Sequence, residues 1–143
     1  MNLNRFLRRL IPARWRHLAA QGAVNQPVPA VTSSDVERVV RRDFPNEQFD
    51  VTIALLKESR EPVRVQLAAL KLANGSLEKL RTHIEVAKRD YRDVLAAAEY
   101  PSYFKIGFRV RELPDDERRQ IIDSDCGQYE EWLRKRRNPQ PQE

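Results

Sequence analysis

Residues 77–98, LEKLRTHIEVAKRDYRDVLAAA, have the clearest periodicity in the chain and decide its fold class. Apolar residues recur here at alternating steps of three and four, the spacing that places side chains on one face of a helix. They are Leu77, Leu80, Ile84, Ala87, Tyr91, Val94 and Ala98. The pattern predicts a helix of about six turns that packs against other helices of the same chain. A coiled coil is the less favoured interpretation, because the repeat barely covers three heptads.

The preceding segment predicts a partner for this helix. Val63 to Ala73 is polar only at Arg64, Gln66 and Lys71, which indicates a central helix that other helices cover on most sides. Asn74-Gly75-Ser76 then predicts a left-handed helix end followed at once by a new N-cap. We therefore expect the two helices to pack as a hairpin.

Two further helices are predicted upstream. Ser34-Asp35-Val36-Glu37 has the form of a capping box, so a first helix is expected from there to Pro45. Asn46 can cap a second helix, and Pro62 suits the first turn of the central one.

The segment after Pro101 has a different period. Apolar and polar residues alternate from Phe104 to Val110, as in a strand, so an extended segment is expected, either across the helices or paired with a second copy. A short helix is the alternative. Pro114 then opens one helix, and another is expected from about Asp125 to Arg137.

Together these patterns predict an all-α protein, a compact bundle of about five to six antiparallel helices with one short extended segment, preceded by a basic amphipathic N-terminal arm. The expected domains are an arm with a proline-containing linker at 1–32, a helical domain at 33–137 and a disordered tail at 138–143.

Composition limits the classes of function. The single cysteine, Cys126, can form neither an intramolecular disulfide nor a thiolate metal site, which favours a reducing, cytoplasmic setting. No run approaches the roughly 18 to 20 apolar residues of a membrane-spanning helix. The four glycines are isolated, so no phosphate-binding loop is predicted, and the two histidines have no metal ligands at suitable spacing. We predict no catalytic residues, no metal and no cofactor.

The net charge of +5 lies in the arm, because residues 1–32 hold five arginines and no acid. The arm combines these cations with apolar residues at helical spacing, which suits an anionic membrane surface or an acidic groove of a partner. The candidate contacts are Arg5, Phe6, Arg8, Arg9, Leu10, Ile11, Arg14 and Trp15. Peripheral attachment at the inner membrane face is therefore the alternative to a purely cytoplasmic protein.

A second candidate cluster lies in the long helix. Asp90 and Asp93 are three residues apart and could bind a divalent ion, but adjacent arginines favour an ion-pair or domain-interaction cluster. Its members are Arg89, Asp90, Tyr91, Arg92 and Asp93.

Two other groups of residues contain several cations, and the first of them is a weaker candidate for nucleic-acid binding. Aromatic residues from Tyr100 to Phe108 alternate with cations and could stack on bases, although such aromatics are more often core. Arg134-Lys135-Arg136-Arg137 is a cationic cluster whose ordinary explanation is the negative end of a helix dipole.

Four segments resemble a family of short bacterial proteins of unknown function. They are residues 63–75, 87–95, 98–101 and 125–133, within a resemblance that covers about 35–135. It implies a bacterial, helical, non-secreted protein and transfers no functional residue.

The sequence therefore predicts a non-enzymatic bacterial protein that acts by binding another macromolecule, first of all a protein. The alternatives are peripheral membrane association through the N-terminal helix, nucleic-acid binding through the basic arm, and an enzyme whose site assembles only in three dimensions.

Overall fold

The computed structural model describes residues 26–137, and within this range the chain is all-α, as predicted. No strand is present among these residues. It has six α-helices and two short 3₁₀ helices in this range. In order they are α3 (Ser33–Asp43), η2 (Asn46–Gln48), α4 (Phe49–Ser59), α5 (Val63–Ala73), α6 (Leu77–Glu99), α7 (Pro101–Ile106), η3 (Gly107–Glu112) and α8 (Asp115–Arg134).

The hairpin of α5 and α6 forms as its sequence predicts. Asn74 and Gly75 both take left-handed backbone conformations, with φ of 48° and 82°. The Ser76 hydroxyl then accepts a hydrogen bond from the Lys79 backbone N–H at 3.3 Å, which starts α6. Gly75 is also required by space, because a Cβ there would lie 2.5 Å from the backbone oxygen of Asp43. The turn between the hairpin helices thus contacts the end of α3.

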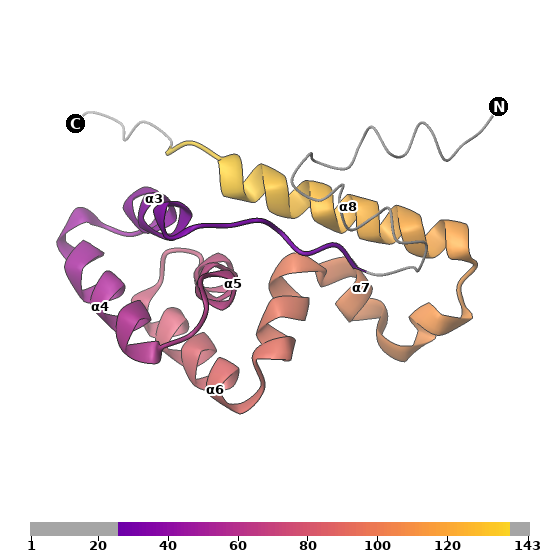
Figure 1. The fold of residues 1–143 in the computed structure, drawn as a ribbon, viewed down its shortest axis with the longest axis horizontal. Coiled ribbons are helices and arrows are strands. Elements are labelled where there is room, and N and C mark those ends of the chain that lie inside the picture. The colour runs from indigo at the N-terminus through magenta and orange to yellow at the C-terminus, as the bar shows by residue number, and fades with distance from the viewer. Residues whose placement is uncertain (1–25, 138–143) are drawn as a thin grey trace.

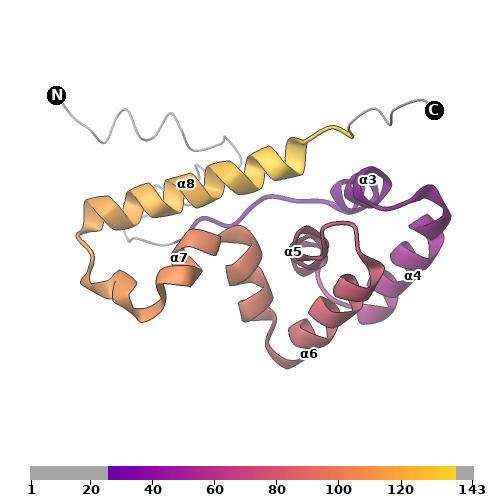
Figure 2. The same cartoon turned by 180° about the vertical axis from the view of Figure 1, so that it is seen from behind.

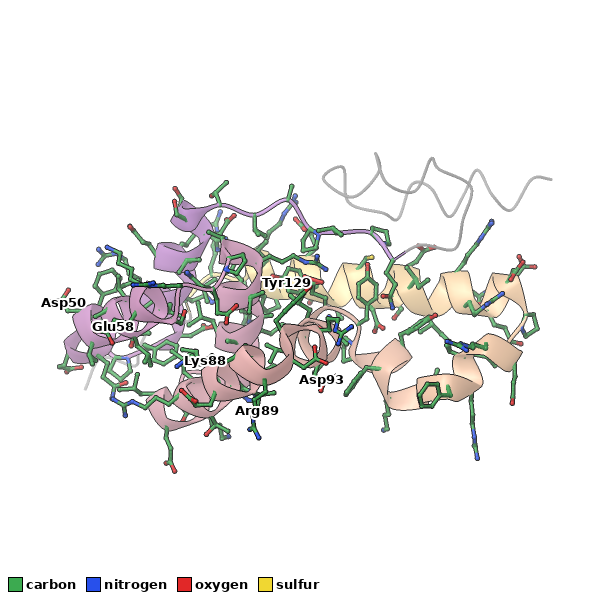
Figure 3. All side chains as sticks on the ribbon, turned by 60° about the horizontal axis from the view of Figure 1, so that its bottom comes forward. Asp50, Glu58, Lys88, Arg89, Asp93 and Tyr129 are labelled. Carbon is green, nitrogen blue, oxygen red and sulfur yellow. The ribbon has the colours of Figure 1, made fainter. Side chains whose placement is uncertain are left out.

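The core surrounds α5, which lies among α3, α4 and α6 (Figures 1 and 2). Most of its residues are buried, as expected for a central helix. The largest fully buried side chains come from five helices and one loop, and include Phe44, Leu56, Leu67, Leu70, Leu80, Val94, Tyr129 and Leu133. Tyr129 reaches the interior from α8 (Figure 3).

The last helix and the first described residues connect the two ends of the molecule. α8 runs from the neighbourhood of α7 back to α3, and the extended residues 26–32 run beside it (Figures 1 and 2). Pro27 and Pro29 are buried, and the Tyr100 hydroxyl donates a hydrogen bond to the Pro27 carbonyl oxygen. These residues are therefore extended, but they pack against the helices.

The predicted start of the first helix is wrong by two residues. Thr32 is the N-cap of α3, and its backbone N–H donates to the Asp35 carboxylate at 2.9 Å. Asn46 begins η2, so the second α-helix starts only at Phe49. Both errors reflect several possible capping residues lying close together.

The long helix α6 has a kink that its periodicity conceals. Asp90 has non-helical dihedrals, φ −153° and ψ 96°, because its carboxylate accepts hydrogen bonds from the backbone and side chain of Arg92. Such local bonds compete with the helical ones. Tyr91, expected on the buried face, is consequently 52% exposed.

The strand expected within 103–111 is wrong. Residues of this segment form α7 and η3 instead, which matches the short-helix alternative. Asp125 of α8 explains the outcome, since its carboxylate accepts hydrogen bonds from the backbone N–H groups of Ser102 and Tyr103 at 3.2 and 3.0 Å. Gly107, with φ of 66°, then separates α7 from η3. The cap comes from a distant helix, so local alternation could not reveal it.

The two helices expected after Pro114 are one. α8 continues through Cys126 and Gly127, next to the expected start of a second helix at about Asp125. Gly127 is helical here, and a Cβ at this position would meet no atom within 4 Å. Packing of Ile122, Tyr129 and Leu133 on the core outweighs the modest helix cost of one glycine.

Candidate basic-groove site

The predicted contacts of the arm, from Arg5 to Trp15, lie outside the residues that the structure describes. None of the described helices is long and apolar enough to cross a lipid bilayer.

The predicted cluster at 89–93 lies on the exposed side of α6 (Figure 3). Asp90 pairs with Arg92, with the carboxylate accepting from the guanidinium Nε at 2.9 Å. These hydrogen bonds lower the pKa of the Asp90 carboxyl. Because the helix breaks at Asp90, Asp90 and Asp93 do not lie on one regular helix face. Within residues 26–137, no three His, Cys, Asp or Glu side chains gather as metal ligands.

A buried polar network that the sequence did not predict joins α5, α6 and α8. The carboxylate of Glu99, whose side chain is 1% exposed, accepts from the Arg64 Nε at 2.8 Å and from a terminal nitrogen at 2.5 Å. Burial raises the pKa of Glu99 while Arg64 opposes this, and the ion pair raises the pKa of Arg64. Gln128 donates to the Ala98 carbonyl oxygen at 3.3 Å, which ties α8 to the end of α6.

The network continues through Tyr100 and Cys126. The tyrosine hydroxyl lies 3.5 Å from the thiol sulfur, and burial raises the pKa of both groups, that of Cys126 to about 11. Glu99, Tyr100 and Cys126 are each at most 2% exposed. A substrate would not reach these groups without separating the helices, so the network holds the helices together.

The exposed candidate site lies where the C-terminal ends of α3 and α8 meet (Figure 1). A groove of about 590 Å³ there, the basic groove, is lined by seven cations. They are Arg38, Arg41, Arg42, Arg134, Lys135, Arg136 and Arg137. A neighbouring pocket of about 710 Å³ shares four of these residues and adds polar side chains.

Two arginines of α3 build the groove by binding the end of α8. Arg38 donates to the Leu133 carbonyl oxygen at 2.6 Å. Arg42, whose side chain is 6% exposed, donates to the carbonyl oxygens of Trp132 and Lys135 at 2.7 and 3.0 Å. Its guanidinium also lies over the Trp132 ring at 5.2 Å. These bonds satisfy carbonyl groups that a helix end leaves unpaired.

Of the other five cations of the groove, one has an acidic partner and four do not. Arg134 pairs with Glu130 at 2.5 Å. Arg41 lies over the Phe49 ring at 4.0 Å, and Arg137 donates to the Asn46 side-chain oxygen at 3.4 Å. Arg41, Lys135, Arg136 and Arg137 are all exposed and form no ion pair with an acid among residues 26–137. Four positive charges therefore remain available to a ligand.

The sequence indicates four of the seven cations of this groove, because residues 134–137 form a cationic cluster. It does not connect them with the arginines at the end of the first helix. The contact joins residues 95 positions apart, from Arg38 to Leu133, and no local pattern predicts it.

Comparison with known proteins adds no relative. No family model, no curated protein and no solved structure matches this chain.

Proposed function

We propose that this chain is a non-enzymatic binding protein whose basic groove holds an acidic segment of a partner protein. The observation that carries the proposal is the group of four exposed cations, Arg41, Lys135, Arg136 and Arg137, which lack an acidic partner among the described residues. In a domain with 21 bases and 21 acids from residue 33 onward, like charges gathered at one place favour an anionic ligand.

The helix dipole does not account for this group of cations. Cations near a helix C-terminus complement its negative end, and that was the ordinary explanation of residues 134–137. Here Arg38 and Arg42 already donate to the last carbonyl oxygens of α8. The remaining cations are left for another acceptor.

The lining of the neighbouring pocket favours a peptide over a nucleic acid. Beside the shared cations it contains the carboxylates of Asp43 and Glu47 and the amides of Asn46 and Asn74. The Asp43 carboxylate is paired with Arg42 at 2.6 Å, which leaves the Glu47 carboxylate as an acceptor. A peptide can donate backbone N–H groups to this acceptor, whereas a phosphate backbone has no such donors and is repelled by it. Charge is thus arranged for an acidic but mixed polar segment.

The proposal is tested by binding of a short fluorescent peptide of alternating glutamate and serine. The groove variant replaces Arg41, Lys135, Arg136 and Arg137 with glutamine. We expect its affinity to fall by at least about fourfold, since four partly exposed charge contacts contribute about 0.2–1 kcal/mol each. Arg38 and Arg42 are left unchanged because they hold α8.

The matched control replaces four exposed cations outside the groove with glutamine. These are Lys57, Lys79, Arg81 and Arg89 on α4 and α6. Both variants lose the same formal charge, so an equal loss of affinity in both would reject a specific groove. Tighter binding of a single-stranded oligonucleotide than of the peptide would reject an acidic protein as the partner class.

A further inference from the structure

The end of the molecule away from the basic groove exposes large apolar side chains. Phe108 of η3 is 88% exposed and Phe104 of α7 is 49% exposed. These are high values for phenylalanine, which folded domains usually bury. We refer to residues 101–112, which form α7 and η3, as the aromatic corner.

Cations accompany these rings. Lys105, Arg109 and Arg111 are exposed and have no ion pair with any acid between residues 26 and 137. Glu112 is the single acid of the aromatic corner. The surface thus combines apolar rings with unpaired positive charge.

The aromatic corner is held in place by the rest of the fold. Asp125 caps the start of α7 through the backbone N–H groups of Ser102 and Tyr103, and Val110 is 5% exposed. The segment is therefore anchored on one side, while Phe104 and Phe108 remain on the other. Their exposure follows from the packed structure.

The arm joins the domain beside this corner. The Tyr100 hydroxyl donates to the Pro27 carbonyl oxygen, directly before the first residue of α7. The extended segment meets α7 at this point in both views (Figures 1 and 2). The described chain thus begins close to the start of α7.

We propose that the aromatic corner docks on an anionic lipid bilayer, with Phe104 and Phe108 entering the interface and Lys105, Arg109 and Arg111 meeting the headgroups. Apolar insertion and electrostatic attraction together are the requirements for interfacial binding. This inference is independent of the basic groove, which lies at the other end of α8.

A bilayer suits the corner better than a nucleic acid does. Single strands bind in grooves that follow their backbone and stack bases in succession. The aromatic corner instead forms a turn at one end of the molecule (Figure 3). A planar surface can meet such a turn without a groove.

The test is sedimentation of full-length protein with vesicles of phosphatidylcholine alone or mixed with phosphatidylglycerol. The variant replaces Phe104 and Phe108 with serine. We expect binding to the anionic vesicles to weaken by about tenfold, because removing the partial burial of two phenylalanine rings changes a binding constant by about this factor. The control is Val51→Ser, at an apolar side chain of α4 that is 43% exposed.

A second variant, with Arg109 and Arg111 changed to glutamine, separates charge from apolar insertion. It should bind anionic vesicles less well and bind phosphatidylcholine as the wild type does. Circular dichroism checks that both variants keep their helices. Unchanged vesicle binding by the Phe104→Ser, Phe108→Ser variant would overturn the proposal and leave the arm as the only anchor. Failure of the full chain to bind any vesicle would overturn it too, as would retention of an oligonucleotide alone.

Discussion

Removing Arg64 should destabilise the protein in a manner that depends strongly on pH. The Glu99 carboxylate is buried and Arg64 is its ion-pair partner, so an Arg64→Met substitution leaves a buried charge without compensation. The folded protein can avoid this buried, unpaired charge by protonating Glu99. From its ordinary pKa of 4.5, protonation at pH 7 costs about 3.4 kcal/mol, at about 1.36 kcal/mol for each of 2.5 pH units.

This protonation cost sets an upper limit on the free energy of unfolding that the Arg64→Met variant can lose. Arg64 is 32% exposed, so water replaces part of its contribution. We expect Arg64→Met to lower the free energy of unfolding by about 2–3 kcal/mol at pH 7 and by less than about 1 kcal/mol at pH 4.5. The sign follows because burial already raises the folded-state pKa of Glu99 above its unfolded value, and loss of Arg64 raises it further. Stability is then retained below pH 4.5 and lost as pH rises toward the folded-state pKa.

Urea unfolding followed by circular dichroism at both pH values measures the effect. The double variant Arg64→Met, Glu99→Leu should recover to within about 1 kcal/mol of the wild type, since apolar residues often replace a buried pair without loss. Lys88→Met breaks the exposed pair with Glu85 and should cost no more than about 0.5 kcal/mol. The same loss for Arg64→Met at pH 4.5 and pH 7 would refute a buried, uncompensated Glu99.

Two other predictions concern Cys126 and the glycines. Burial raises the pKa of the Cys126 thiol from 9.0 to about 11, so the stability that the neutral thiol contributes is kept below pH 9 and lost between pH 9 and pH 11. Over that range the free energy of unfolding, measured in urea, should fall by about 2–3 kcal/mol less in the Cys126→Ala variant than in the wild type. The same dependence of this free energy on pH in both proteins would contradict the prediction. Gly75→Ala should lower the free energy of unfolding by at least about 1–2 kcal/mol, because Gly75 has a positive φ and lies close to the Asp43 backbone oxygen. Gly127→Ala, in the middle of a helix, should raise this free energy by up to about 1 kcal/mol in thermal unfolding. Similar effects at both positions would contradict the geometry.

The helical hairpin was predictable because its signals are local. The periodicity of 77–98 and the Asn74-Gly75-Ser76 turn act within a few residues of one another, and the structure has the expected helices and the expected left-handed turn. The kink at Asp90 was missed because a single aspartate bonding to Arg92 leaves the apolar period intact.

Features that depend on distant contacts could not be predicted. The alternation from Phe104 to Val110 is a sound strand pattern, but Asp125 caps this segment as a helix from the opposite side of the fold. The basic groove likewise exists only once the first and last helices meet, through Arg38 and Arg42.

The most direct test of the basic groove is a titration of the isotope-labelled full chain with the acidic peptide, followed by amide chemical shifts. We expect saturable changes concentrated at the groove, in residues 41–47, 74 and 132–137, with no comparable changes in α4 or α7. The groove variant, with its four cations replaced by glutamine, should lose these changes. Shifts spread evenly over the basic residues of the chain, or concentrated away from the ends of α3 and α8, would contradict a binding groove at this position.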